Sequence, residues 1–177
     1  MSTTLPNEFS EALKKVQNTK GLIIDLRNNP GGVLDNAIIL ANTFVNDGAI
    51  VSIHNRQGQE YSILADPQIP TLGQPAVILV NKGSASASEI FCGALKDYDR
   101  AIVVGEQTFG KGMVQKIYNL PNKTGMNITV AKYLTPNGSD INKQGIHPHY
   151  VIKNPEDSYL PNDLQLNKAI SVLKTMI

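Results

Sequence analysis

Three short, uninterrupted apolar runs constrain the fold of this chain most strongly. They lie at residues 21–27, 76–81 and 101–104. Each run has the length of a strand, and continuous rather than alternating apolar residues are typical of strands covered on both faces of a parallel or mixed sheet. We therefore expect these runs to form buried strands.

Helical and hairpin patterns occupy most of the remaining chain. Apolar residues recur at helical spacing in residues 7–16, 34–45, 86–98 and 162–176. Two hairpins are expected, one joining 49–56 to 59–65 and one joining 114–120 to 126–135, and residues 150–152 read as extended. Because strands alternate with helices but hairpins intervene, the sequence predicts an α/β fold with a mixed sheet flanked by helices.

Length and charge limit the possible functions. The chain has 177 residues, of which 41% are hydrophobic, and this suits the core of one domain. Lys and Arg number 16 against 15 Asp and Glu, so no net field favours nucleic acid, and a neutral partner such as a polypeptide fits better. The sequence contains no run of about 20 apolar residues, so it does not predict an integral membrane segment.

Three serines crowd the start of the helix that follows residues 76–81. They are Ser84, Ser86 and Ser88. Ser86 and Glu89 have the spacing of a capping box, which alone could explain a serine here. The residues around it are all small, however, and an uncluttered helix N-terminus would let a peptide carbonyl approach a nucleophilic serine. Capping and catalysis both remain open, as does the choice among the serines.

A serine nucleophile needs a base, and Lys111 is the candidate. A lysine can act as a base when burial brings its pKa from about 10.4 to near 7 or 8. Lys111 follows an apolar run, has glycine on both sides and has Phe109, Met113 and Val114 nearby, so we expect it to be buried. The Gln115 amide could orient the lysine. The alternative is an ordinary solvated surface lysine.

Backbone donors for an oxyanion are the third requirement of acyl transfer. Pro30-Gly31-Gly32 follows the first apolar run, and glycine lets a backbone N–H approach a substrate closely. The N–H of Ala87 is a second candidate donor. An ordinary turn between a strand and a helix would explain the glycines equally well.

Other chemistries fit less well. Residues 105–111 have the spacing of a phosphate-binding loop, but Gly112 replaces the expected Ser or Thr and a strand pattern follows. His147 and His149 lack further metal ligands nearby, and Cys92 lies among apolar residues where a core role is expected. The sequence therefore implies neither a metal nor another cofactor.

Taken together, the motifs resemble the carboxyl-terminal processing peptidases, or tail-specific proteases, of peptidase family S41. The resemblance covers about residues 20–152, and the segments that carry it are Asp-Leu-Arg-Asn-Asn-Pro-Gly-Gly at 25–32, Asn-Lys-Gly-Ser-Ala-Ser-Ala-Ser-Glu-Ile at 81–90, Gly-Glu-Gln-Thr-Phe-Gly-Lys-Gly-Met-Val-Gln at 105–115, Tyr-Leu-Thr-Pro-Asn-Gly at 133–138 and Gly-Ile-His-Pro at 145–148.

This resemblance implies a serine endopeptidase that cleaves polypeptides near their C-termini, with Ser86 as nucleophile, Lys111 as general base and Gln115 orienting the lysine. It also implies an oxyanion hole from the N–H groups of Gly32 and Ala87, with Gly31 as an alternative, and a core similar to the ClpP/crotonase fold. No cofactor is implied. Family members suggest an extracytoplasmic location such as the periplasm or the thylakoid lumen. The oligomeric state stays open.

The chain also departs from the family pattern. Only about 20 residues precede the Asp-Leu-Arg-Asn segment, where family members usually carry a PDZ domain, so we expect residues 1–177 to be a single catalytic core without that module. His149 stands where the family commonly has Asp. The alternative function is a non-catalytic domain that binds peptides or other ligands on the same fold.

Overall fold

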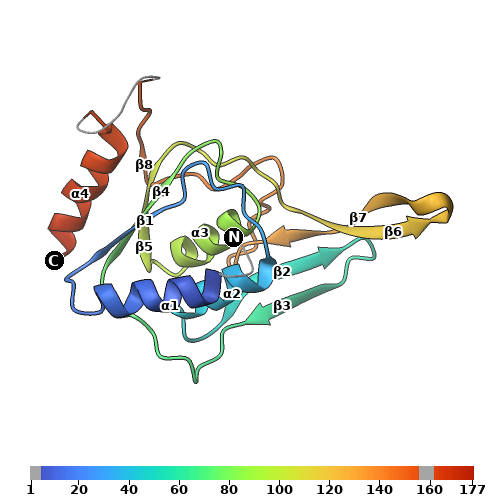
Figure 1. The fold of residues 1–177 in the computed structure, drawn as a ribbon, viewed down its shortest axis with the longest axis horizontal. Coiled ribbons are helices and arrows are strands. Elements are labelled where there is room, and N and C mark those ends of the chain that lie inside the picture. Colours follow the sequence, from blue (N-terminus) through green and yellow to red (C-terminus); the bar gives the residue numbers. More distant parts are fainter. Residues whose placement is uncertain (1–4, 156–161) are drawn as a thin grey trace.

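The strands form two separate sheets in a computed structural model that describes residues 5–155 and 162–177 (Figure 1). The parallel sheet has the order β1 (Leu22–Asp25), β4 (Ala76–Val80), β5 (Ala101–Gly105) and β8 (Tyr150–Val151). The antiparallel sheet has the order β3 (Glu60–Leu64), β2 (Ala49–Asn55), β7 (Thr124–Leu134) and β6 (Met113–Leu120). The predicted α/β class and both predicted hairpins are confirmed, and the parallel and antiparallel strands are divided between the two sheets.

Four α-helices accompany the sheets within the described residues. They are α1 (Leu5–Val16), α2 (Leu34–Asn42), α3 (Ala87–Asp97) and α4 (Leu164–Met176), and a short 3-10 turn, η1 (Pro121–Lys123), joins β6 to β7. The helix predicted over 34–45 ends earlier because Thr43 caps it, with its hydroxyl donating to the Leu40 carbonyl at 2.7 Å. None of the helices in the described ranges has the length and apolar character needed to cross a bilayer.

β4 lies at the centre of the core, and its alternating side chains separate two apolar clusters. Ile78 and Val80 face the larger cluster, which contains α2 and α3, whereas Val77 and Leu79 face the cluster beneath α4. Both faces are covered, so every residue of β4 is completely buried and the continuous apolar run is explained. The same expectation was wrong for β1, which is an edge strand and is only partly buried.

The β6–β7 hairpin projects from the body of the molecule (Figure 1). β6 begins at Met113, two residues after Lys111. The β6–β7 hairpin therefore starts next to the segment that contains Lys111, the candidate general base.

His149 makes two hydrogen bonds to β5. Its Nδ1 accepts from the Val103 N–H at 2.9 Å, and its own N–H donates to the Val103 carbonyl at 2.8 Å. Only the neutral ring can accept at Nδ1. Partial burial lowers the pKa of His149, as does the nearby Lys96, while Asp99 acts in the opposite direction.

These contacts predict a pH-dependent contribution to stability from His149. Because the folded-state pKa is lowered, the contribution is present above the unfolded pKa of about 6.5 and is lost as pH falls below it. His149→Asp keeps an acceptor for Val103 and should remove this dependence, which the exposure of His149 limits to well below about 1 kcal/mol. Urea unfolding at pH 7 and pH 5 measures it.

His147→Asn is the matched control because His147 is an exposed histidine two residues away. It should leave the pH dependence intact. Equal pH dependence in the wild type and in His149→Asp would contradict the assignment to His149.

Candidate active site

The three serines occupy different environments. Ser84 is completely buried, where its Oγ donates to the Leu26 carbonyl at 2.7 Å and accepts from the Asn81 N–H at 3.0 Å. Ser88 is also completely buried and donates to the Asn29 carbonyl at 3.1 Å. Ser86 is only half-buried at the N-cap of α3. Two serines are therefore committed to internal hydrogen bonds, and Ser86 has access to the surface.

Ser86 has an unusual backbone conformation, with φ 56° and ψ −120°. Positive φ is costly for a residue with a side chain and persists only where neighbouring contacts fix it. Those contacts include one half of the predicted capping box, in which Glu89 Oε2 accepts from the Ser86 N–H at 2.8 Å, and a backbone hydrogen bond from the Glu89 N–H to the Ser86 carbonyl at 2.8 Å. Serving as a helix cap and presenting a side chain at the surface are thus compatible at this position.

The Pro30-Gly31-Gly32 turn lies directly against Ser86. A Cβ on Gly31, which has φ +94°, would lie 2.8 Å from the Ala87 nitrogen and 2.9 Å from the Ser86 Cβ. Glycine is required here by both backbone conformation and space. The Gly31 N–H donates to Asn29 Oδ1 at 3.0 Å, which favours the exposed Gly32 over Gly31 as a donor to a ligand.

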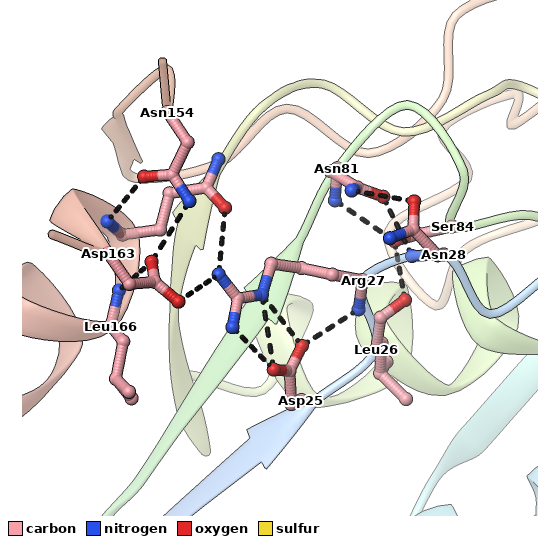
Figure 2. A network of polar contacts seen from close by, with 10 residues as sticks. Asp25, Leu26, Arg27, Asn28, Asn81, Ser84, Asn154, Asp163 and Leu166 are labelled. Carbon is pink, nitrogen blue, oxygen red and sulfur yellow. Dashed lines mark hydrogen bonds and ion pairs between the residues drawn. The ribbon is translucent and has the colours of Figure 1, made fainter. Parts of the chain in front are cut away.

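Paired asparagines tie the segment after β1 to the segment after β4 (Figure 2). The Asn28 N–H donates to Asn81 Oδ1 at 2.9 Å, and Asn81 Nδ2 donates to Asn28 Oδ1 at 3.0 Å. One residue further on, the Asn29 carbonyl accepts from the Ala85 N–H at 3.0 Å. These bonds fix the glycine turn relative to the Ser86 loop.

Arg27 links the same segment to α4 (Figure 2). Its guanidinium contacts both carboxylate oxygens of Asp25, and its Nη1 donates to Asp163 Oδ2 at 2.7 Å. Hydrogen bonds to Asp25 raise the pKa of Arg27 and outweigh its partial burial. Burial alone would raise the pKa of Asp163, the N-cap of α4, but hydrogen bonds from Leu166, Asn154 and Arg27 lower it. Arg27 is thus a structural cation held by ion pairs to Asp25 and Asp163.

Lys111 comes close to Ser86 through its backbone, but its side chain is not buried. The Lys111 N–H donates to Glu89 Oε2 at 2.9 Å, the oxygen that also accepts from Ser86. Lys111 itself is exposed, so the expected burial was wrong. Its flanking glycines are explained by close packing, because a Cβ on Gly112 would lie 2.4 Å from the Asn142 nitrogen, and one on Gly110 would lie 2.9 Å from the Lys143 carbonyl carbon.

Gln115 lies on β6 opposite Thr129 and is exposed. The pairing shifts between Val114 and Gln115, with Val130 as the extra residue on β7, and such bulges re-aim side chains. Within residues 5–155, no hydrogen bond joins the side chains of Ser86, Lys111 and Gln115 to one another. The structure brings the Ser86 and Lys111 backbones together but does not show a hydrogen-bonded side-chain triad.

Glu89 is the residue whose importance the sequence reasoning missed. It is completely buried, and its carboxylate accepts four hydrogen bonds. Oε1 accepts from Thr108 Oγ1 at 2.5 Å and from the Gly110 N–H at 2.7 Å, and Oε2 accepts from the N–H groups of Ser86 and Lys111. The sequence does contain a signal for this role. Glu89 lies within the largely apolar stretch 87–95, whereas a carboxylate that only caps a helix needs no apolar surroundings.

The alternative chemistries lose support. The N–H groups of Gly110 and Lys111, which a phosphate-binding loop would offer to phosphate, donate to Glu89 instead, and the strand β6 follows. Complete burial raises the pKa of Cys92 to about 12, which keeps it a thiol rather than a nucleophilic thiolate.

Comparisons with known proteins agree with the fold and the motifs. A sequence profile of Peptidase family S41 matches residues 1–152. The "Carboxyl-terminal-processing protease" of Synechocystis sp. is 44% identical over 172 residues, covering 94% of this chain and 40% of the relative. The "C-terminal processing peptidase, chloroplastic" of Tetradesmus obliquus is 43% identical over 157 residues, covering 89% of this chain and 33% of that protein.

A solved structure named photosystem II D1 C-terminal processing protease superposes with a TM-score of 0.82 at 37% identity, over 99% of this chain and 44% of that one. This chain thus spans less than half the length of these relatives. The profile match, the sequence identities and the shared fold lead to one conclusion: the chain belongs to peptidase family S41.

Proposed function

We propose that this chain is the catalytic core of a serine endopeptidase that processes polypeptides near their C-termini. Ser86 is the nucleophile, Lys111 the general base and Gln115 the residue that orients Lys111. The observation that carries the proposal is the strained conformation of half-buried Ser86 at a helix N-terminus, packed against Gly31 and linked through Glu89 to the Lys111 backbone.

The proposed reaction begins when Ser86 Oγ attacks the carbonyl carbon of a peptide bond and its proton passes to neutral Lys111 Nζ. The N–H groups of Gly32 and Ala87 stabilise the resulting oxyanion. Lys111 then returns the proton to the leaving amine, and an acyl-enzyme remains on Ser86. Water then gives a proton to Lys111 and attacks the ester carbonyl; as the ester bond breaks, the Ser86 oxygen takes that proton back from Lys111, and the new C-terminus leaves as a carboxylic acid that ionises in water.

A bound polypeptide would supply the dry surroundings that Lys111 lacks in the free chain. Phe109, which is 67% exposed, and Met113, which is 40% exposed, flank Lys111 with apolar surface. A substrate lying across them would exclude water from the amine, and exclusion of water favours the neutral form of a lysine. This coupling supports polypeptides as substrates, as the names of the relatives also suggest, and requires neither a metal nor another cofactor.

The setting of the whole protein is part of the proposal. We place it outside the cytoplasm, in line with the family resemblance and with a relative named as chloroplastic. The described residues form one catalytic domain. Recognition of the substrate's C-terminal tail would have to come from regions comparable to those parts of the relatives that this chain does not match.

Replacing Ser86 tests the nucleophile. Ser86→Ala should lower cleavage of an unstructured polypeptide by at least about 10³-fold, because no covalent intermediate can form. A peptide-linked fluorophosphonate probe, long enough to cover Phe109 and Met113, should label the wild type at Ser86 and fail to label the variant.

Ser88→Ala is the matched control. It removes a neighbouring internal hydrogen bond and should lower stability by about 1 kcal/mol while cleavage by the folded protein persists. Undiminished cleavage in Ser86→Ala would overturn the mechanism, and peptide binding without cleavage by the wild type would favour the non-catalytic alternative.

Replacing Lys111 tests the base. Lys111→Ala and Lys111→Arg should each lower kcat by about 10²- to 10⁴-fold, because neither side chain can accept the serine proton near neutral pH. Lys143→Ala removes another exposed lysine, on the segment packed against Gly110, and should retain activity. A chelator should leave the wild type active. Full activity in Lys111→Arg would exclude a general-base role.

A further inference from the structure

We infer that Glu89 is a positioning residue that fixes the backbones of Ser86 and Lys111 relative to each other through a single carboxylate. The inference rests on the proposed function for its catalytic consequence. Its structural basis is independent of that function, because Glu89 Oε2 accepts both N–H groups, at 2.8 Å from Ser86 and 2.9 Å from Lys111.

The contact set matches an ionised carboxylate. Four donors converge on two oxygens, which matches the capacity of a carboxylate, an acceptor-only group with about four lone-pair sites. The donors are three backbone amides and one hydroxyl, and within the described residues no cation pairs with Glu89. A buried charge without a counter-ion depends on its hydrogen bonds, so each of the four is costly to remove.

The fourth donor extends the arrangement to a more distant segment. Thr108 donates its hydroxyl proton to Glu89 and accepts from the Ile146 N–H at 2.7 Å. A Cβ on Gly145 would lie 2.5 Å from the Thr108 carbonyl oxygen, so this segment is packed closely. The Lys111 loop is thus anchored on one side by Glu89 and on the other by residues 141–146.

Glu89 acts through its neighbours rather than on a substrate. Its carboxylate is completely buried and both oxygens carry two donors, so it has no free position for a reacting group. The two backbones that it holds are those of the residues proposed to exchange a proton. Displacements of about 1 Å in such pairs can cost about 100-fold in rate.

Glu89→Gln is the direct test because it keeps size and shape. If the amide nitrogen takes the place of Oε1, the Thr108 hydroxyl can turn to accept from it, but the Gly110 N–H loses its acceptor. If the amide nitrogen takes the place of Oε2, the N–H groups of Ser86 and Lys111 both lose their acceptor. The variant should lose about 100-fold in kcat, with KM within about threefold of the wild type.

Leu95→Ala is the control for lost stability. Leu95 is completely buried six residues further along α3, and its truncation leaves a cavity. At a temperature where circular dichroism shows both variants folded, Leu95→Ala should keep kcat within about threefold. A kcat for Glu89→Gln within about threefold of the wild type, or an equal loss in Leu95→Ala, would overturn the inference.

Amide hydrogen exchange gives a readout that does not need activity. In the wild type, the amides of Ser86, Gly110 and Lys111 should be protected although none of the three lies within a helix or strand, and Glu89→Gln should accelerate exchange at one or more of them by about tenfold. Unchanged protection at all three in Glu89→Gln would overturn the positioning role. Accelerated exchange in a chain whose wild type cleaves no polypeptide would support that role while refuting the proposed function.

Discussion

The geometry of the site depends on one shared acceptor, the Glu89 carboxylate, placed where three loops leave one parallel sheet. The glycine turn follows β1, Ser86 follows β4 and Lys111 follows β5, and these strands are neighbours in that order. Parallel neighbours end at the same edge, so motifs far apart in sequence converge there. The sheet brings the loops together, and Glu89 and the Asn28–Asn81 pair fix their separation.

Much of this architecture could be predicted from the sequence because it has a local cause. The apolar run at β4, the helical face of α3 and both hairpins follow from periodicity, and all were found close to their predicted bounds. The division into two sheets and the edge position of β1 could not be predicted, since strand order depends on pairings between distant residues. The site residues were selected by family resemblance, and their roles remain proposals.

Two features of the site eluded sequence reasoning for different physical reasons. Lys111 was expected to be buried because apolar residues surround it in the sequence, but Phe109 and Met113 are themselves exposed, so local hydrophobicity did not translate into burial. Glu89 was considered only as part of a capping box with Ser86, whereas three of its four donors, Thr108, Gly110 and Lys111, lie on a segment that only the tertiary fold brings near it. In both cases, burial was decided by distant segments.

The exposure of Lys111 has a consequence for selectivity in the proposed mechanism. In that mechanism a substrate must cover Phe109 and Met113 to exclude water from the Lys111 side chain, so we expect molecules too small to cover them to be poor substrates. Because Glu89 fixes the backbone positions before a substrate binds, the free-energy cost of ordering on binding is reduced. The substrate then has to order side chains and displace water, but it does not have to rearrange the loops. In the proposed mechanism, rigid backbones and a solvated side chain therefore have complementary roles.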